Sequence, residues 1–367
     1  MTATVFIMPC LRRKMSTEMM KDIYDLTKTE LGERLTDMGE RPYRAKQIFS
    51  WLHERGASSF DDMTDISKDL RKRLKEEFIF GGLSLDTVQI SKLDGTRKYL
   101  FAMEDKALIE GVRMKYRDWS TACISSQAGC AMGCRFCAST ISGLDRDMTA
   151  GEMAQEIYLM ERDAGNKISN VVIMGSGEPL LNYDNLMRFI DIITDPDGKG
   201  ISQRNITVST CGIVPGIRRL AEENRNGGHL QINLAISLHA PNDEKRKKIM
   251  PVAEKYGMDE LMDAARFYYE KTHRRLTFEY ALMAGENDSE EDARELAGRL
   301  KGLNALVNLI PVNPVREGGF RRPERENCVS FKNKLENFGI NGSIRRELGS
   351  DIDGACGQLR MRKGKKS

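Results

Sequence analysis

The stretch Cys130-Ala-Met-Gly-Cys134-Arg-Phe-Cys137 places three cysteines within eight residues, directly after an apolar, β-branched run at 121–125. Three thiolates at these spacings can hold three corners of one iron–sulfur cubane and leave the fourth iron without a protein ligand. A structural zinc site would need a fourth ligand, and none of the four histidines lies nearby in the sequence. The stretch therefore predicts a 4Fe–4S cluster with one iron open to a second ligand.

From residue 120 onward, short apolar or β-branched runs alternate with amphipathic stretches of helical length. The runs lie at 121–125, 171–174, 206–210, 233–238, 276–282 and 306–312. The helical stretches lie at 149–162, 183–194, 214–224, 258–272 and 288–302. This alternation predicts an α/β fold built from parallel βα units. In such folds we expect the side chains that carry chemistry at the C-terminal ends of the strands.

The residues before 120 follow two other patterns. From 20 to about 80 the sequence predicts helices, of which one begins at a capping box formed by Thr27 and Glu30 and another covers Asp69 to Phe78. From about 82 to 115, shorter alternating runs predict a few antiparallel strands. We therefore expect a small helical unit, a strand-rich connection and a larger α/β unit.

The composition, 40% hydrophobic and 30% charged over 367 residues, is typical of a globular protein, and no stretch approaches the roughly 20 apolar residues of a membrane span. The N-terminal apolar patch precedes its basic residues, whereas a secretory signal has the reverse order. We therefore expect a cytoplasmic protein that does not bind membranes. Methionines at 15, 19 and 20 suggest that about the first 14 residues are a start-site extension.

Basic residues gather in one loop and at the C-terminus, although the net charge is only +3. The loop residues are Arg316, Arg321, Arg322 and Arg325, and the tail residues are Arg360, Arg362, Lys363, Lys365 and Lys366. Such groups are either solvated surface or contacts to the phosphates of a nucleic acid. The charge pattern alone favours the solvated interpretation.

A second motif, Val171-Val-Ile-Met-Gly-Ser-Gly-Glu-Pro179, is an apolar run that ends in a glycine-rich turn. By itself such a turn is more often only a tight connection. The cysteine spacing, however, resembles the signature of the radical S-adenosylmethionine (SAM) superfamily, and this turn resembles the Gly-Glu-Pro turn of its barrels. The resemblance implies that SAM binds the open iron and that Glu178 holds its amino group.

Along almost the whole chain the sequence resembles the RlmN/Cfr type of RNA adenine methyltransferases. The matching segments are 25–27, 43–49, 59–64, 123–130, 209–215, 234–243, 278–280, 308–314 and 349–359. The resemblance implies a partial (β/α)6 TIM-like radical SAM barrel with a small N-terminal helical domain. The implied divisions are the extension (1–19), a helical accessory domain that binds RNA (20–82), a strand-rich linker (83–118), the radical SAM core (119–350) and a C-terminal segment (351–367).

The same resemblance implies roles for two cysteines outside the cluster motif. Carbon 2 of adenine is an electrophilic amidine carbon, which simple displacement at a sulfonium cannot methylate. In this family one SAM methylates a cysteine, which matches Cys356, and a second SAM yields the radical that activates this methyl group. Cys123 matches the cysteine that resolves the covalent adduct through a disulfide with Cys356. Glu110 aligns with the proton acceptor, and a Cys123 thiolate is a competing candidate.

The cofactor contacts that the resemblance implies lie at predicted strand ends. They are Gly177, Glu178, Ser209, Ser237, Leu238, His239 and Asn313. The two serines could instead satisfy backbone groups, and His239 could be a buried, hydrogen-bonded side chain. Cys10 and Cys328 match no family role, and Cys211 is expected near the site without a part in the reaction. Two departures from the family pattern, Ser176 and Ala-Ser-Thr at 138–140, remove no reacting group.

The implied substrates are 23S rRNA, at an adenosine of the peptidyl transferase region, and tRNA, at the adenosine 3′ of the anticodon. We also expect two SAM molecules per turnover, a reductant such as flavodoxin or ferredoxin, and a monomer. A Cfr-type enzyme that methylates carbon 8 is the nearest alternative. A radical SAM enzyme of small molecules or proteins and a non-catalytic RNA-binding protein with a structural metal are the others.

Overall fold

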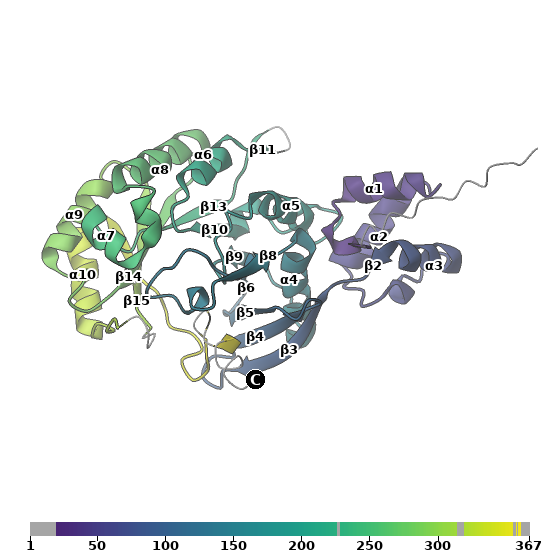
Figure 1. Cartoon of the computed structure of the whole chain (residues 1–367), viewed down its shortest axis with the longest axis horizontal. Coiled ribbons are helices and arrows are strands. Elements are labelled where there is room, and N and C mark those ends of the chain that lie inside the picture. Colours follow the sequence, from purple (N-terminus) through teal and green to yellow (C-terminus); the bar gives the residue numbers. More distant parts are fainter. Residues whose placement is uncertain (1–19, 226–227, 314–318, 355–356, 358, 361–367) are drawn as a thin grey trace, which may run out of the picture.

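The computed structural model describes residues 20–225, 228–313, 319–354, 357 and 359–360. Figure 1 shows a group of helices at one end of the molecule and a large sheet with its covering helices in the remainder. In this described part of the chain, no helix is both long enough and apolar enough to cross a membrane.

The N-terminal helices form because each begins at a suitable cap and buries one apolar face. They are α1 (Lys28–Asp37), α2 (Tyr43–His53) and α3 (Lys68–Glu77). The predicted capping box is confirmed, since the Thr27 side chain accepts from the Glu30 N–H while the Glu30 carboxylate accepts from the Thr27 N–H. Two short parallel strands, β1 (Lys21–Asp22) and β2 (Phe78–Ile79), join the start of this helical segment to its end.

One ten-stranded sheet organises the rest of the chain. Its strands are β3 (Leu83–Ile90), β4 (Arg97–Met103), β5 (Leu108–Lys115), β6 (Ser120–Ile124), β9 (Asn170–Ile173), β10 (Ile206–Thr210), β13 (Asn233–Ser237), β14 (Leu276–Leu282), β15 (Ala305–Pro311) and β16 (Asn341–Ile344). They lie in the order β16-β15-β14-β13-β10-β9-β6-β5-β4-β3. Pairing is antiparallel from β3 to β6 and parallel from β6 to β16. The six predicted parallel strands are present in an open sheet, so the expected α/β fold with an incomplete barrel is confirmed.

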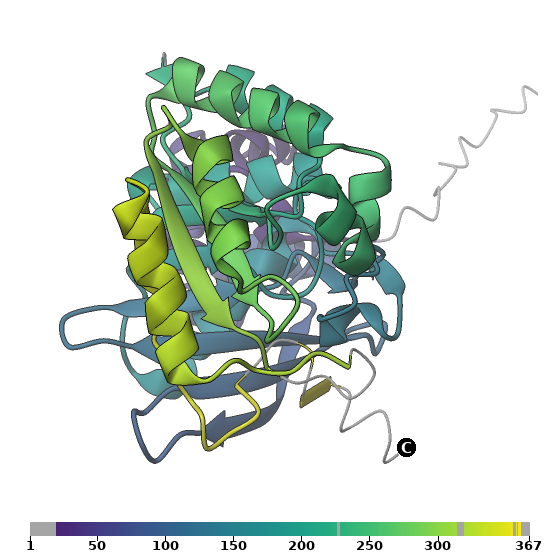
Figure 2. The ribbon, with the colours of Figure 1, turned by 90° about the vertical axis from the view of Figure 1, so that its left-hand side faces the viewer.

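Helices connect the parallel strands and cover the outside of the sheet, as Figure 2 shows for the green and yellow helices. They are α4 (Ala150–Ala164), α5 (Tyr183–Thr194), α6 (Val214–Glu222), α7 (Asp243–Ile249), α8 (Met258–Thr272), α9 (Glu290–Leu300) and α10 (Arg325–Asn337). All five predicted helices are found. The sequence missed α7, which has only seven residues and mostly charged ones, and α10, whose buried face is narrow. It also missed the short edge strand β16.

Smaller pieces complete the architecture near the cysteine motif. The strands β7 (Gln127–Gly129) and β8 (Leu144–Asp147) form a two-stranded hairpin around the motif, and β11 (Asn224–Arg225) pairs with β12 (Gly228–His229) elsewhere. All five residues of β6, the strand that leads to this hairpin, are buried, which is typical of a central strand in a parallel sheet. The hairpin that carries the cysteine motif is therefore joined to a strand buried inside the sheet.

A buried histidine joins the N-terminal helices to the barrel. His53 in α2 shares a 2.8 Å hydrogen bond between its Nδ1 and the hydroxyl of Tyr158 in α4, and its ring lies against Phe49 and Tyr24. Burial lowers the pKa of His53 to about 3. In the folded protein this histidine therefore stays neutral over the pH range in which the same residue of the unfolded chain takes up a proton.

This shift predicts acid destabilisation that the His53→Gln variant should lack. In the unfolded chain this histidine has a pKa of about 6.5 and binds a proton, whereas in the folded protein it does not. The free energy of unfolding of the wild type should therefore fall by about 1.4 kcal/mol more than that of the variant between pH 7.5 and pH 5.5. Urea unfolding of both proteins at these pH values measures the difference. The exposed His273→Gln variant is the control. Equal pH slopes for wild type and His53→Gln would contradict the assignment.

Candidate active site

A cavity of about 540 Å³ opens at the C-terminal ends of the parallel strands. Ten residues that the sequence singled out line it: Cys123, Cys130, Cys134, Cys137, Gly177, Glu178, Ser209, Ser237, His239 and Asn313. They come from five strands or the turns that follow them and from the loop that carries the cysteine motif. The expectation that the chemistry gathers at strand ends therefore describes this cavity well.

Three of the sequence-predicted residues do not line the cavity or cannot be placed. Leu238 is fully buried, and its backbone N–H donates to the carbonyl oxygen of Glu279 at 3.0 Å. Glu110 is buried on β5 and contacts the C-terminal segment. Cys356 lies outside the described residues. Their assigned roles stay predictions.

The cysteine loop is fixed by hydrogen bonds to its own backbone and to a neighbouring turn. The Cys137 N–H donates to the carbonyl of Cys134 at 3.0 Å, and the Thr140 hydroxyl donates to the carbonyls of both residues. The Arg135 N–H donates to the carbonyl of Ile249, the last residue of α7, at 3.0 Å. The loop therefore keeps its shape in part through hydrogen bonds among backbone groups and the Thr140 hydroxyl.

The thiols suit an iron–sulfur cluster better than a single metal ion. Burial raises the pKa of Cys130 and of Cys134, and the other two thiols raise that of Cys134 further. Such thiols ionise only for a strongly electrophilic partner such as iron. In a cubane each cysteine binds a different iron, so three sulfurs on one cavity wall fit that group.

The Gly-Glu-Pro turn is joined to the cysteine loop through Gln127 of β7. The Glu178 N–H donates to Gln127 Oε1 at 2.8 Å, and a Cβ added to Gly177, which has a φ of 104°, would lie 2.6 Å from the Gln127 Cβ. The Glu178 carboxylate accepts from the backbone N–H groups of Leu180 and Cys211. Burial raises the pKa of Glu178, while these N–H donors oppose the rise. The carboxylate is thus held rigidly at the cavity wall.

The two departures from the family pattern lie in contact with each other. The hydroxyl groups of Ser176, in the glycine-rich turn, and Ser139, just after the cysteine loop, are buried and 3.1 Å apart. They form one hydrogen bond that joins the two motifs of the site. The replacement at 176 and the replacement at 138–140 are therefore accounted for together.

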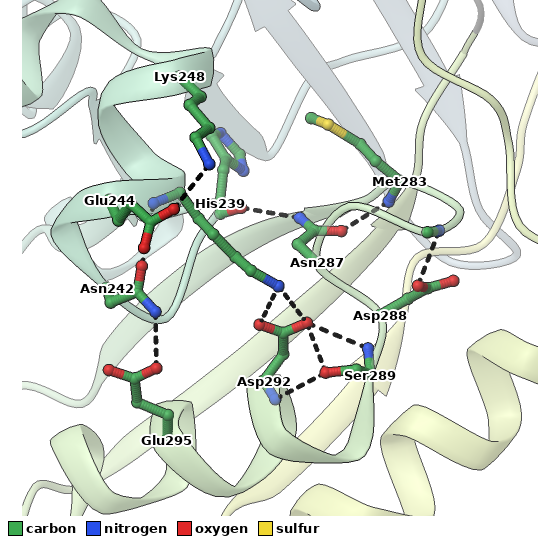
Figure 3. Close-up of polar contacts among 12 residues, drawn as sticks. His239, Asn242, Glu244, Lys248, Met283, Asn287, Asp288, Ser289, Asp292 and Glu295 are labelled. Atoms are coloured by element: carbon green, nitrogen blue, oxygen red, sulfur yellow. Dashed lines mark hydrogen bonds and ion pairs between the residues drawn. The ribbon is translucent and has the colours of Figure 1, made fainter.

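His239 is held in an unusual backbone conformation by an asparagine that the sequence analysis did not single out. Its φ is 58°, and the amide of Asn287 donates to its carbonyl at 2.8 Å while the Asn287 carbonyl Oδ1 accepts from the Met283 N–H (Figure 3). The His239 Nδ1 accepts from the Ala281 N–H at 2.9 Å, so Nε2 carries the ring proton. Burial lowers the pKa of His239 to about 3. The cavity therefore presents a neutral imidazole.

Arg246, also missed by the sequence analysis, lies fully buried beside the site. From α7 its guanidinium donates to the carbonyl of Cys211 at 2.6 Å and to that of Leu238 at 3.3 Å. Burial lowers the pKa of Arg246, whereas the thiols of Cys211 and Cys134 raise it. Cys211 itself lines the cavity, as expected. Its thiol has a pKa well above the usual range because it is buried and beside Glu178.

The second reactive cysteine of the sequence analysis, Cys123, lies on β6 between Val112 of β5 and Val172 of β9. Cys123 lines the cavity. Among the described cysteines, no two are bonded to each other. The expected pairing with Cys356 involves a residue outside the described part of the chain. The disulfide therefore stays a prediction.

Part of the basic loop is used within the molecule. Arg322 lines the cavity, makes a paired salt bridge with Glu347 at 2.9 Å and donates to Asn313 at 3.2 Å. Arg345 and Arg346 also line the cavity. The tail residues 361–367 and Arg316 lie outside the described residues. An RNA contact by the loop or tail stays a prediction.

Comparisons with known proteins agree with this site. Residues 21–80 match the family model of the ribosomal RNA large subunit methyltransferase N-terminal domain, and residues 124–297 match the radical SAM superfamily. A protein of Lachnospira eligens named probable dual-specificity RNA methyltransferase RlmN is 53% identical over 341 residues, 93% of this chain and 96% of that protein. A protein of the same name from Alkaliphilus oremlandii is also 53% identical, over 93% of this chain and 98% of its own.

A solved structure has the same architecture. The crystal structure of a radical SAM methyltransferase from Sphaerobacter thermophilus superposes with a TM-score of 0.87 at 44% identity, covering 92% of this chain and 98% of that one. The sequence matches and this superposition span the helical segment, the barrel and the cysteine loop. The chain belongs to the RlmN family of radical SAM RNA methyltransferases.

Proposed function

We propose that this chain methylates carbon 2 of adenosine 2503 in 23S rRNA and of adenosine 37 in tRNA, with Cys356 as the methyl carrier. The observation that carries the proposal is the cavity, which brings the three-cysteine loop, the Gly-Glu-Pro turn and Cys123 together from separate strands. The names of the relatives, dual-specificity RNA methyltransferases, support RNA of two kinds as the substrate.

The residues of the cavity divide the work between two cofactors. Cys130, Cys134 and Cys137 hold the cluster. SAM is bound by the residues at the strand ends, which are Gly177, Glu178, Ser209, Ser237, Leu238, His239 and Asn313, with Leu238 contributing through its backbone. Bound there, the 4Fe–4S cluster supplies the electron that cleaves SAM to the 5′-deoxyadenosyl radical. The neutral His239 and the buried Glu178 offer SAM one hydrogen-bond donor and one acceptor at the cavity wall.

Two cysteines then transfer the methyl carbon to the adenine and release the product. The S-methyl group of Cys356 loses a hydrogen atom to the radical, and its methylene adds to carbon 2 of the adenine. The resulting radical adduct loses the proton of carbon 2 and one electron, which the cluster would accept, and the sulfur of Cys123 then attacks that of Cys356. The sulfur–methylene bond breaks, its electrons stay with the carbon, and a proton completes the methyl group. An adenine must leave its stack to reach this cavity, so unpaired RNA is the form that binds.

Binding the RNA and reducing the cluster require further parts of the chain and an electron donor. We propose that the helical segment 20–82 and the basic residues near the cavity contact the RNA backbone. A flavodoxin or ferredoxin reduces the cluster, and two SAM molecules are consumed in each turnover. A monomer suffices, because one chain supplies every residue named above.

Nucleoside mass spectrometry tests the proposal. The anaerobically reconstituted protein, incubated with SAM, a reductant and unmodified 23S rRNA or tRNA transcripts, should form 2-methyladenosine in both RNAs. The Cys134→Ala variant should form none, whereas Cys328→Ala, which alters a buried thiol of α10 away from the cavity, should match the wild type. A product that is 8-methyladenosine would identify the Cfr-type activity instead. Methylation of only one RNA would reject the dual substrate.

A further inference from the structure

Gly349, Asp353 and Gly357 of the C-terminal segment contact strands β3 and β5 and the turn between β3 and β4, although about 250 residues separate them in the sequence. The Gly349 N–H donates to the carboxylate of Asp94 at 2.8 Å. Asp353 pairs with Gln89 twice: its N–H donates to Gln89 Oε1 at 2.9 Å, and its carboxylate accepts from Gln89 Nε2 at 3.0 Å. The strands that precede the barrel therefore hold this segment on the side before Cys356.

Glu110 of β5 holds the segment on the side after Cys356. Its Oε2 accepts from the Gly357 N–H at 2.7 Å, and its Oε1 accepts from the Arg360 N–H at 2.5 Å. The Arg360 guanidinium also reaches the carboxylate of Asp145 in β8 at 2.5 Å. Gly357 directly follows Cys356 in the sequence, so Glu110 fixes the backbone of the residue next to it.

The carboxylate of Glu110 is anchored by a buried cation. Lys98 of β4 places its Nζ 2.6 Å from Glu110 Oε2, and the two side chains are 1% and 3% exposed. Both ionised groups are therefore out of water, and the two backbone N–H groups of the C-terminal segment complete the hydrogen bonding of the carboxylate. Three donors take three of its four acceptor positions. A carboxylate committed in this way is suited to holding the segment.

Gly357 is also pressed against the cysteine loop. Its φ is 79°, and an added Cβ would lie 2.7 Å from the backbone of Ala138 and Ser139, the turn that follows Cys137. The same residue thus touches Glu110 on one side and the cluster loop on the other. Only glycine permits both the conformation and the approach.

We propose that the Lys98–Glu110 ion pair is a buried dock that seats the Cys356 segment on the cysteine loop, and that Glu110 is a positioning residue for the methyl carrier. This inference rests on the proposed role of Cys356. It assigns to strands β3–β5 the task of aligning the C-terminal segment with the cavity. It also leaves the proton of carbon 2 to another group, for which Cys123, which lines the cavity, is the candidate.

Hydrogen–deuterium exchange of the folded protein tests the dock without reference to activity. In Lys98→Met and in Glu110→Gln, the peptide that contains 349–360 should exchange about ten- to a hundredfold faster than in the wild type, the factor expected for losing one charge-assisted hydrogen bond. The exposed Lys106→Met variant, in the turn that connects β4 and β5, is the control and should exchange like the wild type. Gly357→Ala should also speed exchange, because it lifts the segment while leaving the ion pair intact.

The mass of the Cys356 peptide separates positioning from proton transfer. If Glu110 positions the segment, Lys98→Met and Glu110→Gln should both lose S-methylation of Cys356 while keeping wild-type iron content. If Glu110 is the proton acceptor, Glu110→Gln should keep the S-methyl group and accumulate RNA joined to the protein, which would overturn the inference. Unchanged exchange of 349–360 in both variants would overturn it as well. A wild-type Cys356 that never carries a methyl group would instead reject the proposed function, while the exchange result still reports on the dock.

Discussion

The Cys356→Ala variant should form no methylated RNA, and the Cys123→Ala variant should accumulate protein joined covalently to RNA. The first change removes the atom that carries the transferred carbon. The second leaves the carrier and the radical step intact but removes the thiol that breaks the sulfur–methylene bond. Cys123 is 5% exposed and lines the cavity from β6, so its loss shortens one side chain without disturbing the loop that holds the cluster.

The two variants are compared by gel shift after denaturation and by mass spectrometry after nuclease digestion. Trapped protein should carry an adenine-bearing adduct on the peptide that contains Cys356. Denaturation without a thiol reductant should not release this adduct. Cys328→Ala is the matched control, since it removes a buried thiol remote from the cavity. If both cysteines were structural, each variant would lose stability and neither would trap RNA. Turnover by Cys356→Ala, or absence of the adduct in folded, cluster-loaded Cys123→Ala, would contradict the two-cysteine mechanism.

The sequence predicted the cavity well wherever position along a strand decides function. Parallel strands place their C-terminal ends along one edge, so residues as distant as Cys130 and Asn313 had to meet once the strands were identified. The cysteine spacing and the Gly-Glu-Pro turn are local features, and local features are what a sequence shows directly. The contact between Ser139 and Ser176 could not be predicted, because it depends on how the loop and the turn face each other.

The missed residues share one property: each is buried, although its neighbours in the sequence are typical of an exposed segment. Arg246 belongs to the run Asp-Glu-Lys-Arg-Lys-Lys, a pattern typical of a solvated helix face, yet it is fully buried. Asn287 lies in a polar turn after β14 and looks like a loop residue, yet its amide is buried and fixes His239. Glu110 was singled out from family resemblance, but its contacts with Gly357 depend on a segment about 250 residues away. Long-range contacts of this kind leave no periodic signal.

Arg246 gives the second large prediction. Among the described residues no carboxylate forms an ion pair with it, and backbone carbonyls accept its hydrogen bonds. The charge nevertheless faces the thiols of Cys211 and Cys134, whose interaction with it raises its pKa. A buried cation beside a group of cysteines favours their ionised, metal-binding form. We therefore expect Arg246 to stabilise the cysteine loop in the state that accepts a cluster.

The Arg246→Met variant should take up severalfold less iron and sulfide during anaerobic reconstitution, and the cluster that it does bind should have a more negative reduction midpoint. Adding an electron beside the thiolates is harder without the cation. The unpaired carbonyls of Cys211 and Leu238 should also lower the free energy of unfolding by about 1–3 kcal/mol each. Iron analysis, redox titration followed by electron paramagnetic resonance, and urea unfolding measure the three effects.

Two further variants distinguish charge from structure at this position. Arg246→Lys keeps the cation but cannot reach both carbonyls, so it should restore the reduction midpoint more fully than the unfolding free energy. Lys247→Met removes an exposed charge from the same helix and should leave all three measurements at wild-type values. If Arg246→Met bound iron fully with an unshifted midpoint and was merely less stable, the arginine would serve only to tie α7 to the ends of β10 and β13. A midpoint that follows the charge and a stability that follows the hydrogen bonds would show that one buried side chain performs both tasks.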